Sequence, residues 1–395
     1  MTTLDDVSER EEALASALFS PEARVDPHPL LRSAGLPGCR YRIVETMLRD
    51  PRLGPQRKGP ASEPLWEMFR RWLINLDGER HARLRRVFAR LFTPRRVEEY
   101  RPVVSRTADR LLDAVEERGA MDVVADFALP LPFSVIVGVL GVPPERHGWL
   151  GERMLVLAQG FARQDDDRFV AAASDAVEEM LDFYAALLEQ RAAEPRDDLL
   201  SVLAAGIPED EDGLPDVLAN CVFFVEAGHE TTTSLISGGT LLLLRHPDVL
   251  ARLRAEPGLV TAAVEEMLRM ITPVTAVICE AREELEIEGH RFGPGRRRFA
   301  FLAAANRDAE AFEDPDRFDP DRPGPSHLAF SAGRHVCLGA PLARLHGEVA
   351  FPALLERLPN LRLDGEPSWR SSLPLRELER LAVAWDTAPE GGGIS

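Results

Sequence analysis

The feature that most constrains the fold is a long apolar segment near the middle of the chain. From about Leu214 to Leu244 it includes NCVFFVEAGHETTTSLISGGTLLLL, with apolar residues on nearly every face of a helix. A helix that is hydrophobic nearly all round must be buried. The segment therefore predicts a central helix around which the rest of the chain packs.

The flanking segments predict further helices and a small β region. From Pro94 to about Gly206, apolar residues recur at helical spacing between short Pro or Gly breaks. Beyond the central helix, Leu285 and Ile287 alternate with polar neighbours, and Gly293-Pro294-Gly295 turns the chain into a second extended run, which indicates a hairpin. We expect a mainly α fold with a small β region.

Length and charge limit the domain organisation and the partners. A chain of 395 residues can form one domain around a buried cofactor, and we expect residues 26–386 to be that domain, with a partly flexible segment at 1–25 and a flexible tail at 387–395. The formal charge of −18 opposes binding to nucleic acid or anionic lipid. We expect neither a signal peptide nor a membrane span, because the first residues are acidic and no run of roughly 18 apolar residues is apparent. The four scattered cysteines are typical of a cytoplasmic protein.

The strongest chemical signal is a lone cysteine at the end of a glycine-containing loop. Cys337 comes directly before the predicted helix APLARLHGEVAFPALLERL. Backbone N–H groups at a helix N-terminus stabilise a thiolate, which can bind ferric iron and favours O–O cleavage in an oxygen-activating haem. Gly333 permits a tight turn, and Gly339 permits close approach of the backbone to a flat macrocycle. A solitary cysteine alone is more often a small buried hydrophobic residue.

The complete string FSAGRHVCLG resembles the haem-binding signature of the cytochrome P450 family, with Phe, Gly, a basic residue, Cys and Gly at the family's separations. Ser331 departs from the pattern, since the family often has Gly there, and we expect a slightly stiffer turn. The resemblance extends from about Asp26 to Trp385 and implies a haem b whose iron is bound by Cys337. The loop residues that it implies as cofactor contacts are Phe330, Gly333, His335, Cys337 and Gly339.

A charged motif follows the family's order. Glu266 and Arg269 match its Glu-x-x-Arg pattern and lie three positions apart on one helix face. Such a pair in isolation is more often an exposed surface ion pair. The resemblance implies that Arg317, in the string PDRF, completes a charged triad that braces the cysteine loop.

The AGHETT string in the central helix resembles the family's oxygen-binding stretch. Small residues such as Ala227 and Gly228 leave room beside the cofactor, and a Thr hydroxyl can bond back to a carbonyl and open the helix locally. Splitting of O₂ needs protons, so Glu230 and Thr231 are the candidate catalytic relay. The alternative is that the small residues only allow close helix packing.

Three residues are implied as ligands of the haem propionates. His81 and Arg85 lie four positions apart on one helix face and form two cationic groups that can clamp carboxylates, and His335 joins them. Surface solvation is the alternative for each. Cys279 stands where the family usually has an Arg, and a neutral thiol cannot supply that charge unless Arg282 compensates.

A second departure lies near the start of the chain. The connection between DPHPLLRSAGLPGC and RYRIVETMLRDPRLG is shorter than the family's, which normally has room there for two extended strands. We expect a pocket mouth that is more open than usual or is closed by another chain.

The resemblance also implies substrate-facing positions. Glu226 is unusual among them because an apolar residue is common there, and a buried carboxylate is costly unless it is paired or protonated. It either binds an amine or hydroxyl of the substrate or pairs with a neighbouring arginine, and the two readings weigh equally. The candidate substrate-binding residues are Phe223, Glu226, Ala227, Thr275 and Val277.

Together these features predict a cytoplasmic monooxygenase that uses O₂ to hydroxylate a small organic molecule in bacterial secondary metabolism. Because no flavin or nucleotide domain fits in the remaining length, electrons from NAD(P)H would arrive through a ferredoxin and a ferredoxin reductase. They would dock near Cys337, with Arg334 and Arg344 contributing positive charge. The alternatives are a peroxide-driven haem oxidase and a non-catalytic haem-binding or partner-binding module with the same fold.

Overall fold

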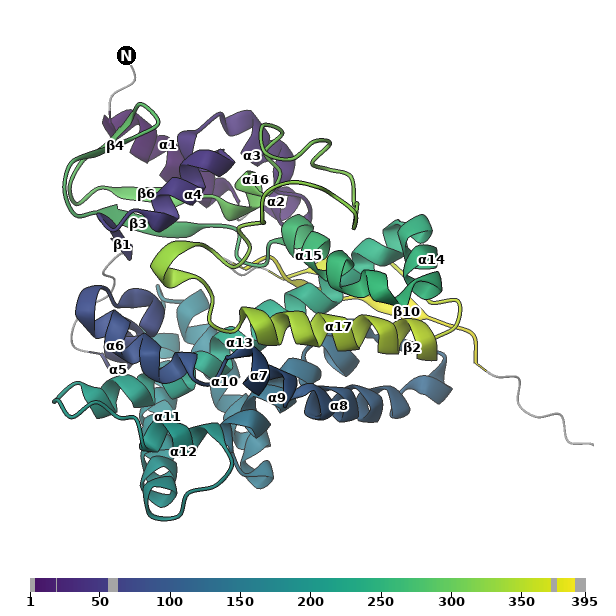
Figure 1. The fold of residues 1–395 in the computed structure, drawn as a ribbon, viewed down its shortest axis with the longest axis horizontal. Helices are drawn as coiled ribbons and strands as arrows, with labels where there is room; N and C mark the ends of the chain where they lie inside the picture. The colour runs from purple at the N-terminus through teal and green to yellow at the C-terminus, as the bar shows by residue number, and fades with distance from the viewer. Residues whose placement is uncertain (1–3, 19, 56–62, 371–374, 388–395) are drawn as a thin grey trace, which may run out of the picture.

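The computed structural model describes residues 4–18, 20–55, 63–370 and 375–387 (Figure 1). Helices make up most of the described chain, and the strands are short. At its centre lies α13 (Gly213–Arg245), most of whose residues are buried. The predicted central helix is therefore confirmed, as is the mainly α fold.

Many of the helices begin with proline in the first turn, where the missing N–H has no intrahelical partner to lose. The other α-helices are α1 (Leu4–Ala17), α2 (Pro21–Val25), α3 (His28–Ala34), α4 (Tyr41–Arg49), α5 (Pro64–Arg71), α6 (Gly78–Ala89), α7 (Pro94–Glu98), α8 (Arg101–Asp113), α9 (Pro130–Leu140), α10 (His147–Ala162), α11 (Asp167–Ala193), α12 (Leu199–Ala204), α14 (Pro247–Ala255), α15 (Val260–Ile271), α16 (Leu302–Ala305) and α17 (Ala340–Arg357). The short helical segments are η1 (Pro37–Cys39), η2 (Leu73–Asn75), η3 (Glu116–Arg118), η4 (Val123–Ala128), η5 (Pro144–Arg146), η6 (Pro257–Leu259) and η7 (Gly333–His335).

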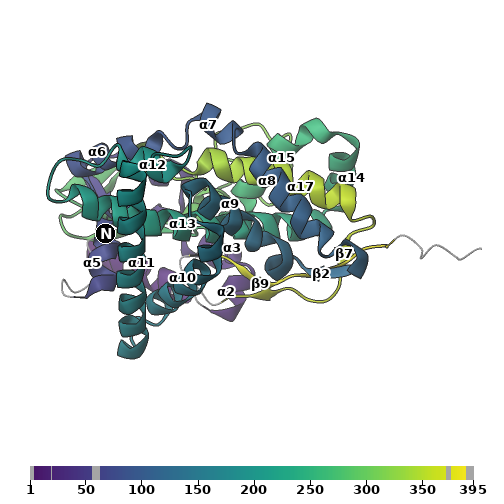
Figure 2. The same ribbon diagram turned by 90° about the horizontal axis from the view of Figure 1, so that it is seen from below.

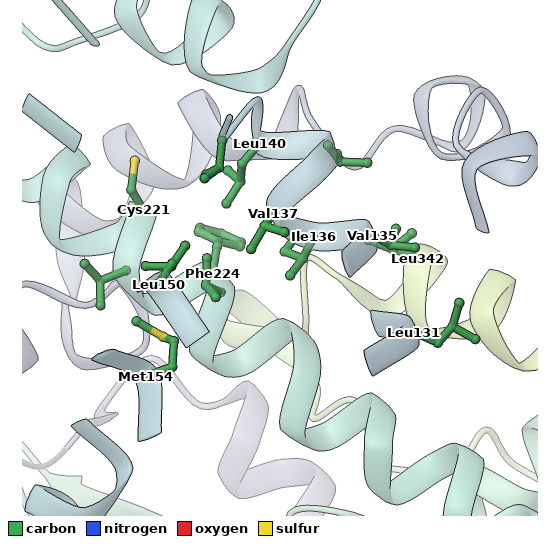
Figure 3. Packing of buried hydrophobic residues seen from close by; sticks show 14 of the residues in the cluster. Leu131, Val135, Ile136, Val137, Leu140, Leu150, Met154, Cys221, Phe224 and Leu342 are labelled. Atoms are coloured by element: carbon green, nitrogen blue, oxygen red, sulfur yellow. The ribbon is translucent and has the colours of Figure 1, made fainter. Parts of the chain in front are cut away.

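The main helical layer is built on α13. Helices α9, α11, α15 and α17 all pack against it, and Figure 2 shows α11 crossing it. Figure 3 shows side chains of α9, such as Val137 and Leu140, in one buried cluster with Cys221 and Phe224 of α13. This apolar contact fixes the middle of α13, where the AGHETT string lies.

One apolar segment was missed in the sequence. Val123–Leu140, which spans η4 and α9, is long and apolar enough to cross a membrane by length and composition, so the expectation that no such run exists was wrong. Most of this segment is buried against α8 and α13. The packing shows that this segment belongs to the protein core, and a buried core helix can be as long and as apolar as a membrane helix.

The strands form small antiparallel sheets. The first sheet has the order β1-β3-β6 and the second the order β2-β10-β7, while β4-β5 and β8-β9 are two-stranded. The strand bounds are β1 (Leu53–Pro55), β2 (Ala120–Asp122), β3 (Val277–Ala281), β4 (Leu285–Ile287), β5 (His290–Phe292), β6 (Arg297–Ala300), β7 (Arg362–Leu363), β8 (Ser368–Trp369), β9 (Leu378–Arg380) and β10 (Ala382–Ala384).

The predicted hairpin exists, but its turn lies elsewhere. Strand β4 pairs with β5 through a tight turn at Glu288 and Gly289, both of which have positive φ. The Gly293–Gly295 segment instead leads into β6, which pairs with β3. Alternation alone could not reveal which strand β6 would join.

The shortened N-terminal connection leaves one strand, β1, among the described residues before α5. Glu11 of α1 is fully buried and lies 2.9 Å from the Arg298 guanidinium, and its carboxylate accepts a hydrogen bond from the Phe299 N–H of β6 at 3.1 Å. Gly38 of η1 also accepts from the Phe301 N–H, and a Cβ there would lie 2.1 Å from the Phe299 carbonyl oxygen. The chain's own N-terminal region therefore covers this sheet edge.

Candidate active site

Cys337 lies where the loop after η7 enters α17. Its N–H donates to the Phe330 carbonyl at 2.9 Å, which closes the loop on itself. Burial raises the pKa of the Cys337 thiol, whereas hydrogen bonds from the N–H groups of Gly339 and Ala340 act in the opposite direction. Its side chain nevertheless remains accessible. A sulfur held by backbone donors at a helix N-terminus is suited to bind a metal as the thiolate.

Two backbone positions shape this loop. Gly333 has φ 68°, and a Cβ there would lie 2.5 Å from the Leu48 carbonyl oxygen of α4. Ser331 also has a positive φ of 61°, which costs a non-glycine residue about 1–2 kcal/mol. Ser331 therefore adopts the backbone conformation that glycine would take at this position, and the turn is strained rather than rearranged.

The charged group behind the loop is buried. Glu266 and Arg269 of α15 are 5% and 2% exposed and form an ion pair at 2.7 Å, so the surface alternative is excluded. The third member is Arg322, whose Nε lies 2.9 Å from Glu266 Oε1. The expected member, Arg317, has a side chain that is 67% exposed and turns to Asp319, so that assignment was wrong. The motif pointed to the first of two nearby arginines, Arg317, whereas the second, Arg322, reaches Glu266.

The implied propionate ligands converge. The rings of His81 in α6 and His335 lie 4.3 Å apart, and Arg85 donates to the Val336 carbonyl at 2.6 Å. Burial lowers the pKa of both histidines to about 4, so His81 is neutral rather than one of two cationic groups as expected. The Nε2 atoms of His81 and His335 are buried without a hydrogen-bond partner among the described residues. Two orphaned imidazole nitrogens beside an arginine fit the carboxylates of a haem.

Cys279 lies in β3 and carries no charge, because burial raises the pKa of its thiol to about 12. The cation that acts on this thiol is Arg334, which lies 2.9 Å from Asp77. Arg282 also approaches Asp77, at 3.7 Å, and lies 3.6 Å from Glu280. Two arginines, Arg334 and Arg282, therefore approach Asp77 on the side of β3 that carries Cys279. Asp77 neutralises part of their charge.

The AGHETT segment forms a continuous part of α13. The Thr231 hydroxyl donates to the Ala227 carbonyl at 2.9 Å, and Thr232 donates to the Gly228 carbonyl at 3.0 Å. A Cβ on Gly228 would lie 3.3 Å from Ile136 of α9, so this glycine allows close helix packing, which was the alternative reading of the small residues. Burial and the charge of Glu377 raise the pKa of Glu230 to about 8. Glu230 therefore holds a proton at neutral pH.

Glu226 lies one turn before Glu230 on the same helix. It is 9% exposed, and its Oε2 atom is buried with no hydrogen-bond partner among the described residues. Burial raises its pKa well above the usual value, and the nearby acids Glu230 and Glu377 act in the same direction. Its carboxylate lies within 4.8 Å of ligand atoms of His229 and Glu230. An arginine partner, which was one of the two equally weighted readings, is not seen in the described part of the chain.

The other implied substrate positions come from α13 and from the segment around the start of β3. The ring of Phe223 packs at 4.8 Å from that of Trp72, and Val277 begins β3. Thr275 is 5% exposed and lines a small hollow together with Trp369, Arg370 and Glu377 of the β8–β9 hairpin. Sequence reasoning missed Arg370 and Glu377, because no motif marks a residue that reaches α13 from a distant hairpin.

These observations define a haem-thiolate protein: a cysteine sulfur at a helix N-terminus, orphaned imidazoles and an arginine beside it, and a central helix with a protonated acid. The chain belongs to the cytochrome P450 family, whose sequence profile, described as Cytochrome P450, matches residues 155–365. It is a monooxygenase of that family.

Similar proteins cover almost the whole chain. The biotin biosynthesis cytochrome P450 of Bacillus subtilis is 34% identical over 369 residues, covering 91% of this chain and 93% of that protein. The 6-deoxyerythronolide B hydroxylase of Saccharopolyspora erythraea is 40% identical over 368 residues, covering 88% and 89%. The crystal structure of P450BioI with an acyl carrier protein ligated to hexadec-9Z-enoic acid has a TM-score of 0.87 and 32% identity, covering 92% of this chain and 100% of that one.

Proposed function

We propose that this monooxygenase binds haem b through Cys337 and hydroxylates a small organic molecule in bacterial secondary metabolism. The observation that carries the proposal is the thiol of Cys337, which accepts hydrogen bonds from the backbone at the start of α17. The hydroxylase name of one relative supports the reaction type. When bound, the haem supplies the site of O₂ activation.

The residues on the cysteine side hold the cofactor. Cys337 would bind the iron as a thiolate, with Phe330, Gly333 and Gly339 shaping the loop that carries it. His81, Arg85 and His335 would bind the propionates, and each imidazole offers its free Nε2 atom for that purpose. Arg334 stands next to Cys279 and supplies the charge that the thiol lacks.

The residues of α13 would manage protons. Glu230 holds a proton at neutral pH because its pKa is raised to about 8, so it can donate without first being protonated. The Thr231 hydroxyl is bonded to the Ala227 carbonyl at 2.9 Å and presents its oxygen as an acceptor next to Glu230. Ala227 and Gly228 keep large side chains away from this part of the helix. Phe223, Glu226, Thr275 and Val277 would face the substrate.

The proposed electron donors are a ferredoxin and its reductase, fed by NAD(P)H in the cytoplasm. Of the two arginines expected at the docking face, Arg334 is largely engaged with Asp77, and Arg344 lies 2.6 Å from Glu265 and stacks on Phe330 at 4.7 Å. Both arginines are paired with an acid, so their positive charge at the docking face is partly neutralised.

The decisive experiment is the spectrum of the reduced, carbon monoxide-bound protein. The wild type and a Cys39→Ala control should show the absorption band of a thiolate-bound haem, and Cys337→Ala should lose it together with turnover. A Cys337→Ala variant that keeps both the band and full turnover would contradict the proposal.

The source of electrons separates the proposal from its alternatives. Product formation from those neutral or ammonium-bearing compounds that shift the haem Soret band should require a ferredoxin, a reductase and NADPH. A higher yield with hydrogen peroxide alone would instead indicate a peroxide-driven oxidase. Haem binding without product under either condition would indicate a non-catalytic module.

A further inference from the structure

Buried acids elsewhere in this chain are paired with arginine. Glu11, Asp216 and Glu266 are 0%, 2% and 5% exposed, and each lies within 3 Å of at least one guanidinium nitrogen. Glu377 is 5% exposed and has the Arg370 guanidinium at 3.8 Å. A buried charge without such a partner is strongly unfavourable. Pairing with arginine is therefore the chain's rule for buried carboxylates.

Glu226 breaks this rule. Its Oε2 atom is buried and has no hydrogen-bond partner, and no ion pair of Glu226 is found within the described ranges. The groups that act on Glu226 make the imbalance larger, because Glu230 lies on the same helix and Glu377 reaches it from the β8–β9 hairpin. Arg370 of that hairpin has a side chain that is 43% exposed and lies beside Glu377.

His229 does not correct the charge imbalance. Its Nδ1 atom is hydrogen-bonded to the Val225 carbonyl oxygen at 2.6 Å, and burial lowers its pKa, so the ring is neutral at pH 7. The same bond occupies Nδ1, so a metal ion at Glu226, His229 and Glu230 would have to use Nε2. We favour an organic cation, since Phe223 lies one turn before Glu226 and packs against Trp72, and aromatic faces attract ammonium groups.

We propose that Glu226 recognises a positively charged nitrogen, so that the substrates of this enzyme carry an ammonium group. This inference rests on the proposed position of Glu226 in the substrate site. Glu377 adds negative potential around the same point, as does Glu230 once it ionises near pH 8, and Phe223 with Trp72 supplies an apolar wall for the methyl or methylene groups next to the nitrogen. A substrate cation would be the missing partner that arginine supplies to the other buried acids.

The proposal has a consequence for pH. The groups facing Glu226 are His229 and Glu230 from α13 and Glu377 and Arg370 from the hairpin, and burial together with the nearby acids raises the pKa of Glu226 well above its usual value. A cation binds the ionised form, so binding releases a proton. The affinity for a permanently charged ligand should therefore rise with pH, by up to about tenfold per pH unit.

The test compares two ligands of almost equal shape on the haem-loaded protein. Phenethyltrimethylammonium carries a permanent charge and cannot ligate the iron, and (3,3-dimethylbutyl)benzene replaces its nitrogen by carbon. Their dissociation constants are measured from the haem Soret shift between pH 6 and pH 9. At pH 8 the wild type should bind the ammonium compound about tenfold more tightly than the carbon compound.

At pH 7, below the titration of Glu230, the Glu226→Gln variant should bind both compounds with about equal affinity, and it should lose the rise in cation affinity between pH 6 and pH 7.5, while its affinity for the carbon compound stays unchanged. Asp321→Asn is the control, since Asp321 pairs with Arg252 on the surface at 2.8 Å, and this variant should behave as the wild type. The unchanged carbon compound shows that Glu226→Gln retains a folded pocket.

Equal binding of the two compounds by the wild type would overturn the proposal, and so would a preference for the cation that survives in Glu226→Gln. A wild type that lacks the thiolate-haem spectrum would contradict the proposed function itself. An intact spectrum with equal binding contradicts only the recognition of charge.

Discussion

Glutamate side chains have opposite pKa shifts on the two sides of the site, the cysteine side and the α13 side. Near the cysteine loop, Arg344 and His327 overcome the effect of burial and lower the pKa of Glu265 to about 2. On α13, burial and Glu377 raise the pKa of Glu230 to about 8. Paired acids hold the loop in one geometry, whereas the less well paired acids of α13 remain able to exchange protons and bind ligands. The difference indicates which side is scaffold and which side takes part in the reaction.

The largest expected effect tests the scaffold. Arg322→Ala removes one of the two guanidinium groups that hold the buried Glu266, and we expect it to lower the free energy of unfolding by about 3 kcal/mol. Chemical denaturation followed by circular dichroism would measure this change. Arg317→Ala, five positions away and exposed, is the matched control and should change stability by less than about 0.5 kcal/mol. Equal effects of both variants would restore the original assignment of Arg317.

The next effect concerns proton delivery. Glu230→Gln should lower product formation by about 100-fold, because a neutral amide cannot donate the proton that the acid supplies. The wild-type rate should fall as the pH rises through about 8, where Glu230 loses its proton. The initial rate of product formation measures both changes. An unchanged rate in Glu230→Gln would remove Glu230 from the relay.

The smallest expected effect concerns the loss of stability caused by the buried, unpaired carboxyl of Glu226. Glu226 is protonated in the folded state, but the unfolded chain ionises it above pH about 4.5, so rising pH favours unfolding. Glu226→Leu should therefore raise Tm by about 1–3 °C at pH 7.5, and the gain should shrink as the pH falls from 7.5 towards about 4.5. Thermal unfolding of the haem-loaded protein at both pH values measures this. A lower Tm in Glu226→Leu at pH 7.5 would show that the carboxyl has a stabilising partner.

The sequence predicted those parts of the fold and the site that are encoded by one uninterrupted segment of the chain. The apolar segment that became α13 and the string from Phe330 to Gly339 are each contiguous, so their pattern was visible without any long-range contact. Prediction failed where one of several similar residues had to be chosen. Arg317 and Arg322 both follow α15, and only packing shows that the second reaches Glu266.

The sequence by itself determined the class of this protein, because a thiol next to a helix start and a buried helix with an acid and a threonine are local chemistry. Only the tertiary structure decided how those groups are partnered. Glu11 meets Arg298 across 287 positions, and Glu377 reaches Glu226 from a separate hairpin. The physical reason is that burial and charge pairing depend on which distant surfaces come together, and these set both the pKa of an acid and its freedom to bind a ligand.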